Sequence, residues 1–98
     1  MKTVTAICVY DSVINTIYNL SFIHGENIIP IVYAGSGKRP SFNYLIEIQR
    51  HILNVAKDNN MRVKCYDISP NVIMYDIKYI NISNPGLINR YYVSKSEG

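Results

Sequence analysis

The chain has 98 residues, of which 48% are hydrophobic and only 17% charged, so it can bury one core and is too apolar to be disordered. The formal net charge of +3 permits an anionic partner but is weaker than the basic stripe of most nucleic-acid-binding domains. No apolar run approaches the ~18 residues of a membrane span, and Asp11 interrupts the N-terminal segment too early for a signal peptide. Composition therefore predicts a single soluble, intracellular domain over residues 1–98.

The abundance of Ile, Asn and Tyr is typical of small viral or phage proteins with AT-rich genomes, which would place the chain in a host cytoplasm. Its two cysteines, Cys8 and Cys65, are too few for a disulfide framework and lack metal spacing. Each lies in a strand-like run, so both are expected to be small buried hydrophobic residues. They can form a disulfide only if their strands are neighbours.

The first expected element is a strand over residues 3–11, "TVTAICVYD", which is β-branched and apolar like a strand covered on both faces. Residues 12–25, "SVINTIYNLSFIHG", fit two structures. A helix would take Asp11 or Ser12 as N-cap and end at Gly25, whereas the alternation over residues 18–23 fits a strand. We favour the helix because both caps fall in the right places.

Residues 27–34, "NIIPIVYA", predict another strand, in which Pro30 indicates an edge position, a bulge or the strand's beginning. Residues 41–60 predict a helix, because apolar side chains keep the i, i+3, i+4, i+7 rhythm and polar ones share the opposite face. Its expected N-cap is Ser41, and the asparagines at 59–60 are its expected left-handed stop.

After position 60 the hydrophobic period changes to two, which is typical of strands. Residues 61–68, 72–82 and 87–93 are separated by turn-forming sequences and predict a C-terminal antiparallel meander, followed by a frayed tail over residues 93–98. The predicted order is therefore β-α-β-α-β-β-β. This describes an α/β fold bordering on α+β, with helices packed on a mixed sheet.

In this arrangement residues 3–11 and 27–34 form adjacent parallel strands, so the segments that follow them meet at one edge of the sheet, where α/β folds bind ligands. Asp11 would lie there. The same edge would hold a flexible, positively charged loop that leads into the second helix and contains Gly35, Ser36, Gly37, Lys38, Arg39 and Ser41.

Glycine amides in such a loop can cradle an anion, the helix N-terminus adds its positive dipole end, and the two cations add full charges. The loop therefore favours a phosphate or carboxylate. It matches neither the Walker A pattern nor G-x-G-x-x-G, so an ordinary turn with solvated cations remains the alternative.

A second candidate contact site lies on the meander, where tyrosines adjoin cations at Lys78, Arg90, Tyr91 and Tyr92. Tyrosines beside cations can stack bases while the cations bind phosphates, although they suit a protein interface equally. Because adjacent residues of a strand point to opposite faces, one of Tyr91 and Tyr92 should be available to a partner. Tyr75 and Tyr79 are expected to pack in the core.

Little in the sequence indicates catalysis. His24 and His51 have no metal-ligand spacing, and no catalytic residue, metal or cofactor is assigned. Asp11 and Asp67 could form an acid–base or metal-binding pair only if their strands are neighbours.

Three functions follow. The first is a non-enzymatic protein that binds nucleic acid or a nucleotide through the loop at 35–41. The second is a protein-interaction module, expected to be a homo-oligomer such as a homodimer. A viral or phage accessory protein that binds a host factor belongs to the same class. The third is a small metal-dependent hydrolase or nuclease that uses Asp11 and Asp67.

Overall fold

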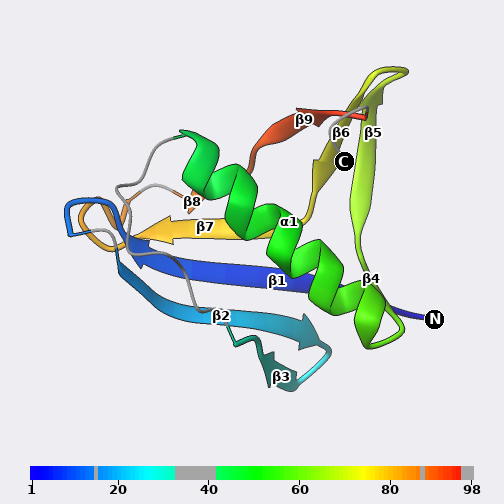
Figure 1. Ribbon diagram of the computed structural model, residues 1–98, viewed down its shortest axis with the longest axis horizontal. Coiled ribbons are helices and arrows are strands. Elements are labelled where there is room, and N and C mark those ends of the chain that lie inside the picture. Colours follow the sequence, from blue (N-terminus) through cyan, green and yellow to red (C-terminus); the bar gives the residue numbers. More distant parts are fainter. Residues whose placement is uncertain (15, 33–41, 87, 96–98) are drawn as a thin grey trace.

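The structure is a computed structural model that describes residues 1–14, 16–32, 42–86 and 88–95. In these residues it is a small mixed α+β fold, mostly sheet, with one helix (Figure 1). The elements are β1 (Lys2–Asp11), β2 (Thr16–His24), β3 (Asn27–Pro30), α1 (Phe42–Asp58), β4 (Met61–Val63), β5 (Cys65–Ser69), β6 (Val72–Tyr75), β7 (Ile77–Asn81), β8 (Ile88–Asn89) and β9 (Tyr92–Ser94). The predicted order β-α-β-α-β-β-β, with more than one helix, is not what the described residues form.

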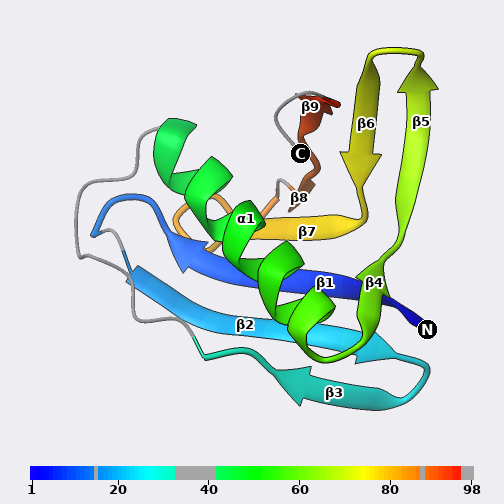
Figure 2. The ribbon, with the colours of Figure 1, turned by 45° about the vertical axis from the view of Figure 1, so that its right-hand side comes forward.

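The strands form two sheets. The main sheet has the order β3-β2-β1-β7-β8, with β4 paired in parallel to the first residues of β1. Strands β5, β6 and β9 form a second sheet, here called the arm sheet, which projects beyond the main sheet (Figure 2).

The arm sheet begins where the chain leaves the side of β1. Lys64 donates its amide to the carbonyl of Val4 at 2.8 Å, and Asp76 donates its amide to the carbonyl of Lys64 at 2.7 Å. The amide of Ala6 then donates to the carbonyl of Asp76 at 3.0 Å. Strand β4 therefore pairs with the first residues of β1, and β7 pairs with the residues of β1 that follow. The chain between β4 and β7 forms the hairpin of β5 and β6.

The helix predicted over residues 12–25 is wrong, because residues 16–24 form β2, antiparallel to β1. Leu20 and Phe22, alternate residues of this strand, both enter the core. Gly25 has φ = +61° in the two-residue turn to β3, a conformation that favours glycine. Backbone pairing with β1 therefore outweighs the helix caps that the sequence offers.

The predicted pairing of residues 3–11 with 27–34 is also wrong. Strands β1 and β3 both run antiparallel to β2, so they share a direction, but β2 lies between them. Pro30 is the last residue of β3, an outer strand of the sheet, which confirms the edge position as one of its three expected places.

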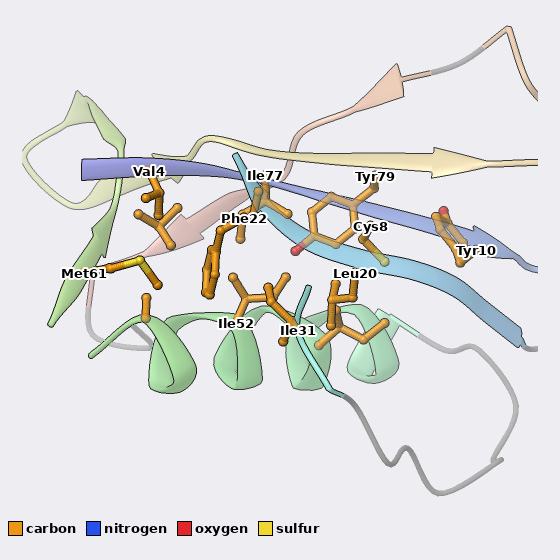
Figure 3. Packing of buried hydrophobic residues seen from close by; sticks show 14 residues of the cluster. Val4, Cys8, Tyr10, Leu20, Phe22, Ile31, Ile52, Met61, Ile77 and Tyr79 are labelled. Atoms are coloured by element: carbon orange, nitrogen blue, oxygen red, sulfur yellow. The ribbon is translucent and has the colours of Figure 1, made fainter. Parts of the chain in front are cut away.

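The core lies between α1 and one face of the main sheet (Figure 3). Alternate residues of β1 point into it and meet the apolar stripe of the helix: Val4, Ala6, Cys8 and Tyr10 from the strand, Ile48, Ile52 and Ala56 from α1. The predicted helix is confirmed over residues 42–58, and Asn60, with φ = 56°, provides the expected stop. Ser41 lies outside the described residues. The expectation that β1 is covered on both faces is wrong, because its other residues are exposed or only half-buried.

The predicted meander is right only in part. The pairs β5–β6, β6–β9 and β7–β8 are antiparallel, but β4 and β7 both run parallel to β1.

Cys8 is buried as expected, whereas Cys65 is exposed on β5, and both are free thiols. Val93 and Ser94 of the expected frayed tail belong to β9. Within the described residues, no helix is long and apolar enough to cross a membrane.

Candidate functional site

The predicted anion-binding loop, with Gly35, Ser36, Gly37, Lys38, Arg39 and Ser41, lies outside the described residues. The two adjacent parallel strands that were expected to frame it are not formed, because β2 separates β1 from β3.

Asp11, the remaining residue of that predicted site, shapes the turn after β1. One of its carboxylate oxygens accepts a hydrogen bond from the amide of Val13 at 2.8 Å. Next to it, Oδ1 of Asn81 on β7 accepts a hydrogen bond from the amide of Ser12 at 3.1 Å, and Nδ2 of the same side chain donates one to the Ser12 hydroxyl at 2.7 Å. The polar groups at this end of β1 therefore bind the turn itself.

The proposed carboxylate pair is not brought together. Asp67 lies on β5, where it forms an exposed ion pair of 3.0 Å with Lys95. Asp11 ends β1 at the opposite side of the molecule, as both views show (Figures 1 and 2). Nowhere in the described part of the chain do three His, Cys, Asp or Glu side chains gather as metal ligands would.

The arm sheet does bring aromatic residues together. Tyr66 of β5 lies opposite Met74 of β6, which lies opposite Tyr92 of β9. The two tyrosines are 39% and 62% exposed, respectively. The alternate residues Tyr75 and Val93 line hollows together with side chains of α1. Strand alternation therefore places the Tyr66–Met74–Tyr92 row on the other face of the arm sheet from Tyr75 and Val93, and at the end of this row Tyr92 also borders the hollow beside α1.

One lysine contacts this row, and a second lies on β7, which follows β6 in the chain. Lys64 places its Nζ 5.3 Å from the centre of the Tyr66 ring, a cation–π contact. Lys78 lies between the buried residues Ile77 and Tyr79, so it points away from α1. We call Lys64, Tyr66, Met74, Lys78 and Tyr92 the basic–aromatic surface.

Two carboxylates in this part of the chain are already paired with cations outside this surface. Asp76, at the start of β7, is only 8% exposed and accepts a hydrogen bond from Nε of Arg90 at 3.1 Å. Asp67 alternates with Tyr66 along β5 and pairs with Lys95. The predicted contact residue Arg90 is therefore already engaged with Asp76.

Tyr91, immediately before β9, is partly buried against the core, whereas Tyr92 is largely exposed. The Tyr91 ring meets that of Tyr79 edge to face, with centres 4.9 Å apart. Burial, together with a side-chain hydrogen bond to Tyr91, raises the pKa of Tyr10 to about 12. Burial likewise raises the pKa of Tyr79. Tyr91 thus belongs to a buried tyrosine cluster with Tyr10 and Tyr79, and the predicted packing of Tyr79 is confirmed.

Sequence reasoning placed Lys78 and Tyr92 at a contact site but missed Lys64, Tyr66 and Met74. Their alternation over residues 61–68 was visible, but the pairing of β5 with β6 and of β6 with β9 was not. His51 of α1 shares a hydrogen bond of 2.7 Å with the carbonyl of Val32 and so links α1 to the residues after β3.

Comparison with family models, with curated proteins and with solved structures finds no match to this chain.

Proposed function

We propose that the chain binds single-stranded nucleic acid on the basic–aromatic surface. Bases would stack on Tyr66 and Tyr92 while Lys64 and Lys78 contact phosphates. One observation carries this proposal: two exposed tyrosines are aligned across the arm sheet beside a lysine that forms no ion pair among the described residues.

The spacing supports a single strand better than a duplex. Neighbouring strands of a sheet lie about 4.8 Å apart, so Tyr66 and Tyr92, two strands apart, are separated by roughly 10 Å. Bases bound to both rings must separate beyond the ~3.4 Å spacing of stacked nucleotides. A duplex keeps its bases stacked and paired, whereas a single strand can splay them onto aromatic side chains.

The loop at 35–41 remains part of this proposal as a second phosphate contact, because Lys38 and Arg39 would extend the positive charge available to a polyanion. A free nucleotide would use the loop alone, whereas a strand of several nucleotides would also need the tyrosines.

The experiment is fluorescence anisotropy with a labelled 12-nucleotide single strand at several salt concentrations. Stacking is worth about 1–3 kcal/mol per base, so Tyr66→Ala and Tyr92→Ala should each weaken binding about tenfold. Lys64→Gln should lower the slope of log affinity against log salt by about 0.7. Tyr18→Ala, at an exposed site on β2, is the matched control and should change nothing. Equal affinities for all four variants, or no binding at low salt, would reject the proposal.

A second candidate is a protein-interaction module, which the exposure of β5 favours. All its residues are exposed, and among the described strands only β6 pairs with it. Such an edge can pair with a strand of another chain, including a second copy. Sedimentation should then show a concentration-dependent dimer, and the charge-neutral change Ile68→Asn on β5 should dissociate it without changing nucleic-acid affinity. A monomer over the whole concentration range would exclude self-association.

A further inference from the structure

A groove of about 440 Å³ lies along the outer edge of β4, between the C-terminal half of α1 and Tyr75 of β6. It exists because the chain turns into the arm sheet after Lys64, so no described strand continues beside β4 on that side. Its volume is within the usual range for small-ligand sites, roughly 300–1,000 Å³.

The floor of the groove is apolar and its rim is positive. Ala56, Met61 and Val63 are buried core residues that also line it, together with Tyr75. Lys57 and Arg62 line it as well, and no carboxylate is among the described lining residues. The side chains therefore offer hydrocarbon contact and two positive charges without an internal counter-ion.

We propose that this groove binds an aliphatic carboxylate, with the hydrocarbon chain on the apolar floor and the carboxylate between Lys57 and Arg62. Burial of hydrocarbon supplies about 0.8 kcal/mol per CH₂, and the cations supply charge-assisted hydrogen bonds. The negative end of the α1 dipole opposes an anion at this position, but it amounts to about half a charge. Two full positive charges outweigh it. The site does not depend on the basic–aromatic surface, with which its described lining shares no residue.

The test is an NMR titration with decanoate, below its micelle concentration, that follows the methyl resonances of Ala56, Met61 and Val63. We expect saturable shifts at these methyls and at least tenfold weaker binding of decanol, which has the same chain without the charge. Lys57→Gln should weaken decanoate binding at least fivefold, and Lys57→Arg should retain it within twofold. Arg50→Gln, an exposed cation of α1 outside the groove, is the control and should have no effect.

Equal binding of decanol and decanoate, or unchanged binding by Lys57→Gln, would overturn the carboxylate assignment. Shifts confined to Ile7, Val9 and Ile80, on the sheet face away from α1, would overturn the location. Tyr66→Ala and Tyr92→Ala should leave decanoate binding unchanged, so this proposal and the nucleic-acid proposal can fail separately.

Discussion

Asp76 is the charged side chain at the junction of the two sheets. Its amide and carbonyl join Lys64 to Ala6, and its carboxylate binds Nε of Arg90 at 3.1 Å. A carboxylate on a side chain that is only 11% exposed is costly without a partner, so Arg90 compensates the charge that the junction buries.

Arg90→Ala should therefore lower the free energy of unfolding by about 2 kcal/mol, less than the 3–5 kcal/mol of a fully buried pair because Arg90 remains partly exposed. Lys95→Ala, which removes the exposed partner of Asp67, should cost less than about 1 kcal/mol. Urea denaturation of both variants measures the difference. Equal losses would show that burial of Asp76 has no energetic consequence.

At the scale of elements, the two sheets differ in how much apolar surface they bury. Strand β1 places Val4, Ala6 and Cys8 in the core, whereas every residue of β5 is exposed. Local opening of a segment costs free energy in proportion to the buried contacts that it breaks. The hairpin of β5 and β6 should therefore open without the rest of the fold.

Hydrogen exchange measures this. The amides of β5 that bond to β6 should exchange at least tenfold faster than those of β1, because opening the hairpin exposes little apolar surface. Saturation with the single-stranded oligonucleotide should slow exchange in β5 and leave β1 unchanged. Exchange of β5 as slow as that of β1 would mean that the arm sheet unfolds only with the whole molecule.

At the scale of the whole molecule, the tyrosine cluster joins the main sheet to the segment that leads into the arm sheet. Tyr10 lies on β1, Tyr79 on β7, and Tyr91 immediately before β9. The clustered rings are held as neutral groups, since burial raises the pKa of both Tyr10 and Tyr79 above the ordinary value of 10.

Folding should therefore become pH-dependent at alkaline pH. The folded state favours the neutral tyrosine. The stability that this preference adds to the fold is therefore fully present below pH 10, and it is lost as the pH rises through the folded-state pKa, about 12 for Tyr10. Urea denaturation at several values from pH 8 to 12 should show a declining free energy of unfolding. Tyr10→Phe should make the decline shallower than in Tyr18→Phe, the exposed control. Identical slopes in the two variants would contradict this account.

The sequence by itself determined what is local. The helix over residues 42–58 follows from its own periodicity, and Asn60 ends it because asparagine tolerates a positive φ. The hydrophobic period of two expected after position 60 holds at Met61 and Val63, which are both buried.

Only the tertiary structure decided which strands pair. Residues 16–24 became a strand through hydrogen bonds to β1, which the local caps could not reveal. Non-local pairing also placed β2 between β1 and β3, so the two strands expected to frame the predicted pocket are not adjacent. It set Tyr66, Met74 and Tyr92 in one row across the arm sheet. The physical reason is that a helix forms its backbone hydrogen bonds within one segment, whereas a strand forms them with a partner that its own residues do not specify.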